Sequence, residues 1–158
     1  MLVLVPLSQV FSWGWGGQGQ LGRVGGRLHH PEREYLTPGL IDLQYRRGRG
    51  RTFPRDLGKA VAIGAGMMHS FIVTENDSVV GFGMNNMGQL GVEPEPASEP
   101  VVLVPMLIPG LSGKGVVQIT GADHHSLALA TKDNVTTVYA CGKSTYGRLG
   151  IESLDMSK

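Results

Sequence analysis

Short runs of apolar residues, rather than long amphipathic stretches, dominate the hydrophobic pattern of this chain. Each run is four to six residues long and is bounded by residues that favour turns, such as glycine, asparagine and aspartate. Runs of this length with these boundaries are typical of β-strands. The predicted strands are residues 60–63, 70–74 and 78–83, followed by residues 116–119, 126–131 and 137–142. Turns are predicted at residues 75–77 and 132–134, and connections at residues 23–59 and 92–115.

A glycine-containing segment occurs three times without gaps. It reads FSWGWGGQGQLG at residues 11–22, VGFGMNNMGQLG at residues 80–91 and YACGKSTYGRLG at residues 139–150. The glycines shared by every copy are Gly14, Gly19 and Gly22, then Gly83, Gly88 and Gly91, then Gly142, Gly147 and Gly150. We interpret these nine glycines as structural residues of a repeated turn.

The first copy also contains the GxGxxG pattern of a dinucleotide-binding turn, formed by Gly14, Gly16 and Gly19. In such a turn the middle glycine lets a pyrophosphate approach the backbone, and a following helix receives the phosphate on its N-terminus. The middle glycine becomes Asn85 and Ser144 in the other copies, and no amphipathic helix is predicted after any copy. We therefore interpret the pattern as part of the repeat and not as a nucleotide site.

A second segment alternates with the glycine segment. IGAGMMHSFIVT at residues 63–74 aligns with ITGADHHSLALA at residues 119–130, which superposes the His-Ser pairs that begin at His69 and His125. The glycine segments themselves are 69 and 59 residues apart. A period of this length, built from short strands and glycine turns, predicts a β-propeller or a solenoid.

Composition supports an all-β fold. The 158 residues include 24 glycines and 9 prolines, and glycine in a helix interior costs about 1 kcal/mol relative to alanine. Trp13 and Trp15 are expected to pack between neighbouring blades. Cys141 is the only cysteine, so the chain has no internal disulfide, which favours a reducing compartment. One cysteine and dispersed histidines offer no spacing of metal ligands, so no metal site is predicted.

The net charge of +1 hides an uneven distribution. Residues 1–60 contain nine Lys and Arg against four Asp and Glu, whereas residues 61–158 contain five against nine. A basic first part predicts one acidic partner at one place on the molecule, rather than a surface coated by nucleic acid.

The two repeated segments resemble the repeats of the regulator of chromosome condensation family, whose fold is a seven-bladed β-propeller. That repeat reads as an apolar pair, AGxxHS, LAL, a hairpin and then VYxWGxxxxGQLG, and Ala122 departs from it where the family usually has glycine. The resemblance implies an incomplete propeller of about three four-stranded antiparallel blades. The repeat units are expected at about residues 1–22, 60–91 and 116–150, with a long connecting loop at residues 23–59.

The order of GQGQLGRV, LTPGLIDLQYRRGRGR, VVGFGMNNMGQLG and YACGKSTYGRLG is similar to that in the family's Ran guanine-nucleotide exchange factors. This similarity implies a chromatin-binding exchange factor that acts in nucleocytoplasmic transport and mitosis. The implied location is the nucleus, and the cytoplasm stays open as an additional location. The implied partners are a Ran-like small GTPase and a histone or nucleosome surface. No cofactor, membrane, small-molecule substrate or covalent catalysis is implied.

The resemblance covers under half of a complete propeller and does not include the wedge-like hairpin that the family inserts into the GTPase. We therefore expect a fragment or a truncated product. A propeller-repeat module that binds proteins without exchange activity stays open as the alternative function.

The resemblance also suggests which residues contact the GTPase. Asp123, His124 and His125 occupy a turn of the kind that faces the GTPase in the family. The alternative is a structural turn whose imidazoles satisfy backbone groups, the role that we favour for His69. By alignment His125 is the structural member, which leaves Asp123 and His124 free to face outward.

Two arginine clusters are candidates for chromatin contact. Arg23, Arg27 and Arg33 lie in a loop that resembles the family's chromatin-contacting loop, and arginine can bind carboxylates of an acidic histone surface in bidentate fashion. A solvated surface loop is the alternative. The second cluster comprises Arg46, Arg47, Arg49 and Arg51. It is either a phosphate-contacting loop or a charged linker.

Overall fold

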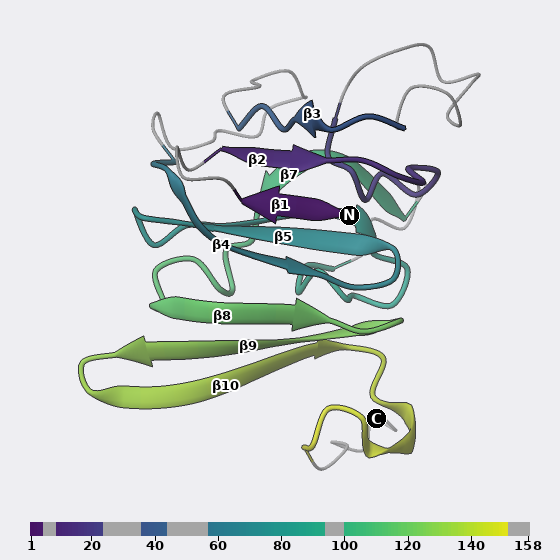
Figure 1. Ribbon diagram of the computed structural model, residues 1–158. Coiled ribbons are helices and arrows are strands. Elements are labelled where there is room, and N and C mark those ends of the chain that lie inside the picture. Colours follow the sequence, from purple (N-terminus) through teal and green to yellow (C-terminus); the bar gives the residue numbers. More distant parts are fainter. Residues whose placement is uncertain (5–8, 24–35, 44–56, 94–99, 152–158) are drawn as a thin grey trace.

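The computed structural model describes residues 1–4, 9–23, 36–43, 57–93 and 100–151. These residues form ten β-strands in three antiparallel sheets and one short 3-10 helix (Figure 1). No helix in this part of the chain is long and apolar enough to cross a membrane.

The three sheets follow one another along the chain. The first sheet contains β1 (Leu2–Leu4), β2 (Val10–Ser12) and β3 (Gly39–Leu40). The second contains β4 (Ala60–Ala65), β5 (His69–Thr74), β6 (Val79–Met84) and β7 (Val101–Leu107). The third contains β8 (Val116–Gly121), β9 (His125–Lys132) and β10 (Val135–Gly142), and the helix η1 (Thr145–Gly147) follows it.

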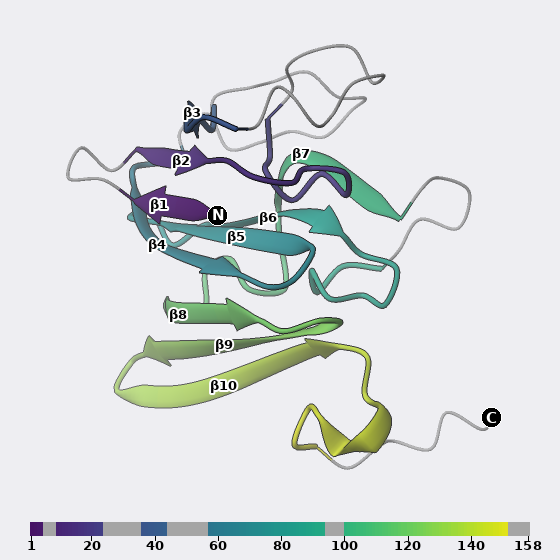
Figure 2. The same cartoon turned by 45° about the vertical axis from the view of Figure 1, so that its right-hand side comes forward.

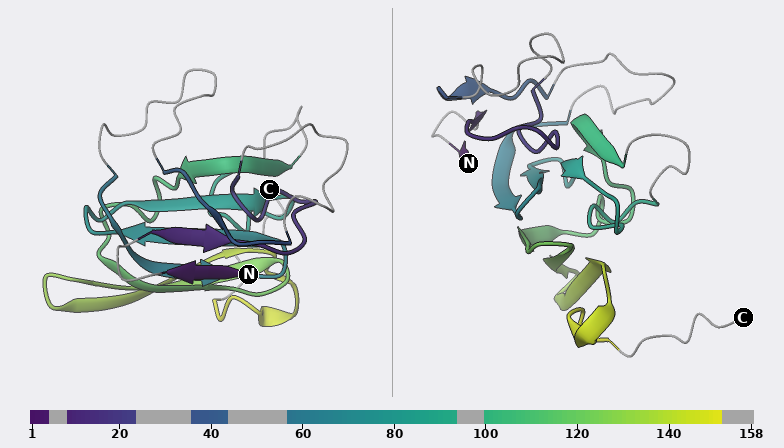
Figure 3. Two further views of the ribbon diagram at one scale, coloured as in Figure 1. Left: turned by 45° about the horizontal axis from the view of Figure 1, so that its top comes forward. Right: turned by 90° about the vertical axis from the view of Figure 1, so that its right-hand side faces the viewer.

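Each sheet is one blade of a propeller. The strands β2, β6 and β10 all lead into a glycine segment, and each pairs with the strand before it, so β1, β5 and β9 are equivalent. The sheets lie one beside the next, with β4 packed against β1 on one side and β8 on the other (Figure 3). The all-β class and the partial propeller of about three blades are confirmed.

The second sheet is buried on both faces because it lies between the other two. Successive side chains of a strand point to opposite faces. Phe71 and Val73 of β5 therefore join a core cluster shared with β8 and β9, whereas Ile72 joins a cluster shared with β2. All six residues of β5 are buried, which explains its unbroken apolar character.

The third sheet differs because β10 is its outer strand (Figure 2). Val135 and Val138 of β10 are 62% and 63% exposed. Its hairpin with β9 turns at Asp133 and Asn134, which have φ of +51° and +62°. Two positive φ values in a two-residue loop define a type I′ turn, the form that matches the twist of paired strands.

The six strands predicted from the apolar runs are all present; five are longer than predicted by one or two residues, and the strand predicted at residues 78–83 is shifted by one residue to Val79–Met84. Both predicted connections, however, contain a strand. Residues 92–115 include β7, which pairs with β6, and residues 23–59 include the two-residue β3. Pro105 lies within β7, close to a shift in its register with β6. Proline is tolerated there because β7 is the edge of its sheet.

Candidate functional site

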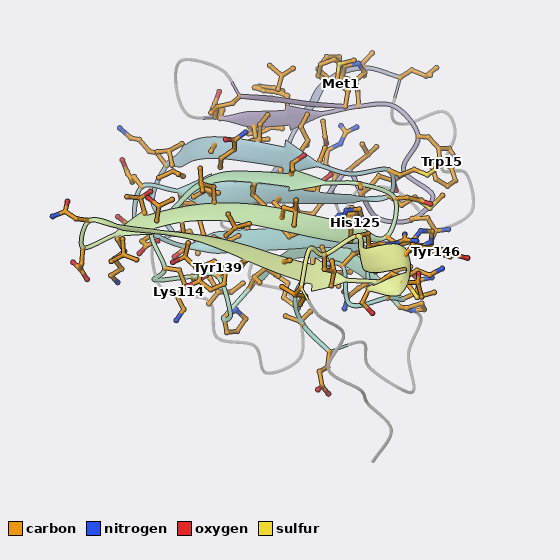
Figure 4. All side chains as sticks on the ribbon, turned by 90° about the horizontal axis from the view of Figure 1, so that it is seen from below. Met1, Trp15, Lys114, His125, Tyr139 and Tyr146 are labelled. Carbon is orange, nitrogen blue, oxygen red and sulfur yellow. The ribbon has the colours of Figure 1, made fainter. Side chains whose placement is uncertain are left out.

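The two His turns and the three glycine segments lie at one end of the strands. The His turns join β4 to β5 and β8 to β9, and the glycine segments follow β2, β6 and β10. Trp15, His125 and Tyr146 lie toward this end in Figure 4, whereas Lys114 lies toward the opposite end. The name "glycine rim" is used for this end, which comprises residues 13–22, 66–69, 82–91, 121–125 and 141–150.

Main-chain hydrogen bonds give the two His turns the same structure. Gly66 N donates to His69 O over 2.8 Å, and Ala122 N donates to His125 O over 2.9 Å. Met67 N donates to Ala122 O over 3.0 Å, a bond that joins the turns of neighbouring blades. The glycine rim is therefore continuous across the boundary between the second and third sheets.

His69 is a buried residue of this boundary. Its Nε2 atom lies 2.7 Å from Ser126 Oγ, and Ser126 Oγ donates to Gln89 O over 2.8 Å. Because Ser126 uses its proton for Gln89, it accepts from His69, which assigns the neutral Nε2–H tautomer to the imidazole. Burial lowers the pKa of His69 to about 4, with smaller lowering by His125 and His124, while Asp123 raises it.

A serine-to-carbonyl bond links each blade boundary in the same way. Ser70 Oγ donates to Gln20 O over 2.9 Å, as Ser126 Oγ does to Gln89 O. Both serines directly follow the histidine position of the repeat, and both glutamines precede the final Leu-Gly of a glycine segment. Sequence alignment had matched these residues without giving the serines a role.

Asp123 and His124 form a pair on the outer side of the turn between β8 and β9. His124 Nδ1 lies 2.8 Å from Asp123 Oδ2, and their side chains are 29% and 57% exposed. The carboxylate holds the Nδ1–H of the imidazole, which leaves Nε2 as the acceptor of a neutral ring. An oriented imidazole beside a carboxylate can exchange hydrogen bonds with a protein partner.

His125 occupies the position of His69 but is only half-buried. Its Nδ1 atom is buried without a hydrogen-bond partner among the described residues, as is Nδ1 of His69. His124 and His125 are thus both half-buried and Asp123 is exposed, whereas His69 is fully buried and bonded to Ser126. Whether any of the three contacts a GTPase stays a prediction.

All nine glycines of the repeat have positive φ, in three matched sets. The values are +103°, +106° and +103° at Gly14, Gly83 and Gly142; +72°, +72° and +67° at Gly19, Gly88 and Gly147; and +63°, +74° and +66° at Gly22, Gly91 and Gly150. At Gly83 and Gly142 a Cβ would also collide with the carbonyl oxygen of Met68 or His124. The repeat thus has a steric reason for glycine that involves no nucleotide.

Among the candidate arginines only Arg23 lies within the described residues. It is half-buried, and its guanidinium packs so closely on Gly39 of β3 that a Cβ at Gly39 would collide with it. Arg23 therefore also contributes to packing in the first sheet. The other candidates lie outside the described residues; they are Arg27, Arg33, Arg46, Arg47, Arg49 and Arg51.

Two aromatic residues of the glycine rim, Trp15 and Tyr146, were not predicted correctly from the sequence. Trp15 is 55% exposed, so its expected packing between blades is wrong. The signal was Lys143, a charged residue at the aligned position of the third segment. Tyr146, which is 96% exposed, was not singled out, although Arg148 beside it replaces the glutamine of the other two segments.

Cys141 lies in the glycine rim, at the end of β10. Burial raises the pKa of the Cys141 thiol to about 11, so this cysteine is protonated at neutral pH and is a poor nucleophile. The thiol lies 3.4 Å from Gln89 O, to which it donates. Within the described ranges, no three His, Cys, Asp or Glu residues gather as potential metal ligands.

A family model described as the regulator of chromosome condensation (RCC1) repeat matches residues 8–73 and 76–129. The chain is 34% identical over 152 residues to Protein pim1 of Schizosaccharomyces pombe, an alignment that covers 96% of this chain and 25% of that protein. It is 29% identical over 160 residues to human Regulator of chromosome condensation, covering 96% of this chain and 34% of the relative. It is also 30% identical over 152 residues to human Probable E3 ubiquitin-protein ligase HERC4, covering 96% and 12%.

Solved structures show the same fold. Yeast RCC1 (Prp20), in a crystal structure with Kap60, superposes with a TM-score of 0.72 at 25% identity, covering 99% of this chain and 30% of Prp20. Prp20p from Saccharomyces cerevisiae superposes with a TM-score of 0.69 at 25% identity, covering 95% and 30%. The chain thus spans about a third or less of the length of the relatives it matches.

Proposed function

This chain belongs to the regulator of chromosome condensation (RCC1) repeat family, and from this premise we propose that it acts within a chromatin-associated guanine-nucleotide exchange factor for a Ran-like small GTPase. The carrying observation is similarity along 96% of the chain to pim1 and to human Regulator of chromosome condensation. Prp20p, a structural relative, has been characterised for its binding to Gsp1p and histones. The nucleus is the location that accords with these partners.

Exchange needs differential binding and no covalent chemistry. An exchange factor binds the nucleotide-free GTPase more tightly than the loaded GTPase, and this difference lowers the barrier to nucleotide release. The Asp123–His124 pair supplies hydrogen-bonding groups in a fixed orientation on the glycine rim. Preorganised groups lose little entropy on binding, which suits them to contact the GTPase.

Histone contact is the second part of the proposal. Arg23, Arg27 and Arg33 are its candidate anchors, because guanidinium groups bind carboxylates of an acidic protein surface in bidentate fashion. Arg46, Arg47, Arg49 and Arg51 are proposed to contact phosphates through charge alone.

The alternative function is a protein-binding module without exchange activity. The observation that favours it is the match to HERC4, named a probable E3 ubiquitin-protein ligase, over a stretch of 152 residues. RCC1 repeats therefore occur in proteins with a different activity, and the fold alone does not decide between the two functions.

Calorimetric titration of the 158-residue chain with a purified Ran-like GTPase separates these functions. The proposal expects tighter binding of the nucleotide-free GTPase than of the GDP-bound form, and about tenfold weaker binding by His124→Ala. Asp133→Asn is the control, because it removes a carboxylate at the opposite end of the strands and asparagine tolerates the positive φ there. Equal affinity for the two GTPase forms, or no binding of either form, contradicts the exchange function. An unaltered affinity in His124→Ala means that His124 does not contact the GTPase.

A further inference from the structure

The side-chain hydrogen bond that stabilises the turn of the third glycine segment differs from that in the first two segments. In the first segment Gln20 Oε1 accepts a hydrogen bond from Gln18 N over 2.9 Å. In the second segment Gln89 Oε1 accepts from Met87 N, also over 2.9 Å. A glutamine side chain thus fixes the same backbone amide in both. The third segment has Arg148 at the glutamine position, and a guanidinium has no acceptor atom.

In the third segment the side chain at this position therefore donates hydrogen bonds, whereas the glutamine of the other two segments accepts one. Arg148 Nε donates to Thr145 O over 2.8 Å, and Arg148 Nη2 donates to Thr145 Oγ1 over 3.2 Å. The backbone around Tyr146 changes with it, because Tyr146 adopts φ of +62°, a conformation that residues with large side chains rarely take. Its counterpart Met87 has no positive φ.

The altered loop presents an aromatic ring to solvent. Tyr146 is 96% exposed in the last described segment, beside which no further sheet is described, whereas Met87 at the aligned position of the second segment is 42% exposed with the third sheet next to it. The Cζ atom of Arg148 lies 5.8 Å from the centre of the Tyr146 ring, so the guanidinium faces the ring. Tyr146 belongs to neither core cluster of the described residues, although its positive φ strains the backbone.

The loop lies next to the turn that carries Asp123 and His124. Lys143 N donates to His124 O over 2.9 Å, which places the start of this loop against the turn, and Tyr146 and His125 lie toward the same end of the molecule (Figure 4). Lys143 and Arg148 give this loop two positively charged side chains.

We propose that Tyr146 and Arg148 form an anchor through which the glycine rim binds an acidic protein surface. Resting on the proposed function, we assign that surface to the Ran-like GTPase, because the anchor adjoins the Asp123–His124 pair. Tyrosine buries a large area while immobilising few torsions, and tyrosine and arginine are prominent among residues that dominate interface energies. Two of the five N–H groups of Arg148 hold Thr145, and the guanidinium retains others for a carboxylate.

The test uses the 158-residue chain, the nucleotide-free Ran-like GTPase and two variants. Arg148→Gln restores the residue that closes the other two segments, so it is expected to preserve or raise the melting temperature while weakening GTPase binding at least fivefold. Tyr146→Ala removes only an exposed ring and is expected to weaken binding about tenfold at unchanged melting temperature. Val135→Ala, an exposed apolar residue at the far end of β10, is the matched control and is expected to alter neither.

A photo-crosslinker at position 146 identifies the partner, with position 135 as the control and with the GTPase and nucleosomes as separate probes. Crosslinking to the GTPase at position 146 alone supports the proposal. Wild-type GTPase binding that neither substitution weakens overturns the anchor and leaves the proposed function standing. Crosslinking to nucleosomes alone overturns the assigned partner. A wild-type chain that binds no GTPase overturns the proposed function and the partner assignment together.

Discussion

His69 Nε2 lies 2.7 Å from Ser126 Oγ, although 57 residues separate the two in the chain and they belong to different sheets. Ser126 in turn donates to Gln89 O, which follows β6 in the sheet of His69. Ser70, the neighbour of His69, donates backward to Gln20 O of the first sheet. In the described turns, the histidine therefore reaches toward the following blade, and the serine reaches toward the preceding one.

Acid is expected to weaken this boundary through His69. The pKa of His69 in the folded chain is about 4, against 6.5 for a free imidazole. Between these pH values the unfolded chain takes up a proton that the folded chain does not, so the free energy of unfolding falls as the pH falls from 6.5 to 4. The loss is about 2 kcal/mol at pH 5. Urea denaturation of the 158-residue chain at pH 7 and at pH 5 measures it.

The matched variants for this experiment are His69→Gln and His124→Ala. His69→Gln removes the titrating group and keeps a side-chain N–H for Ser126, so its stability is expected to depend less on pH. His124→Ala removes only one of the smaller causes of the lowered pKa of His69 and is expected to retain most of the wild-type dependence. An equal loss of stability in wild type and His69→Gln would assign the acid sensitivity to other groups.

Ser126→Ala is expected to destabilise the chain by about 2 kcal/mol, because it leaves the buried His69 Nε2–H without a partner and also removes one of the two hydrogen bonds to Gln89 O, the other being donated by Cys141. Ser70→Ala removes only the bond to Gln20 O, so a loss of about 1 kcal/mol is expected. The exposed Thr136→Ala serves as the neutral control. Chemical denaturation gives the three values, and a loss for Ser126→Ala no larger than that for Ser70→Ala would contradict the linked bonds.

The sequence predicted the strands that lie between glycine turns, because their apolar runs and boundaries are local signals. It missed β7, whose Pro105 is normally a strand breaker and is tolerated here only at an edge near a register shift. It also missed β1, β2 and β3, since two or three residues carry no pattern. Edge position and pairing are properties of the assembled sheet, which local sequence does not contain.

The site was predictable to a different extent. Alignment placed His125 with His69 and separated it from His124, but the structure leaves both residues half-buried, so this division stays a prediction. The partner of His69 was not predictable, because Ser126 comes from the next blade. Replacement of Gln20 and Gln89 by Arg148 was visible in the repeat, but the changed hydrogen bonds of the third segment depend on which side-chain atoms can accept them.

Alanine substitutions at Gly142 and Gly147 distinguish the cost of a steric collision from the cost of a positive φ. Gly142→Ala is expected to cost about 3 kcal/mol or more, because φ is +103° and the new Cβ would collide with His124 O. Gly147→Ala, at φ of +67° with open space around it, is expected to cost about 1 kcal/mol. Thermal unfolding of the two variants measures the difference. Equal losses would mean that the backbone at Gly142 moves to accommodate the methyl group.

The arginines of the first part of the chain are expected to strengthen nucleosome binding. Combined Arg23→Ala, Arg27→Ala and Arg33→Ala substitution is expected to weaken binding by about 2 kcal/mol, the scale of interface anchors. Because Arg23 packs on Gly39, the double variant that retains Arg23 controls for loss of folding. Electrophoretic mobility shifts with reconstituted nucleosomes measure the affinity, and unaltered binding by both variants would return this loop to the solvated-surface alternative.

His124 is expected to contribute to GTPase binding, and His125 is expected to contribute to the stability of the fold. His125 occupies the structural position and is half-buried, so His125→Ala is expected to lower the free energy of unfolding by about 1 kcal/mol or more. The side chain of His124 is 29% exposed and its described ion-pair partner is the exposed Asp123, so His124→Ala is expected to leave stability nearly unchanged. In the exchange factor that carries the complete propeller, His124→Ala is expected to slow nucleotide release roughly tenfold, which corresponds to about 1.4 kcal/mol of transition-state binding. Melting temperatures test the effect on stability, and release of a fluorescent nucleotide tests the effect on exchange. If His125→Ala slows exchange and His124→Ala lowers stability, the two roles are reversed. If neither substitution affects exchange, both histidines are structural.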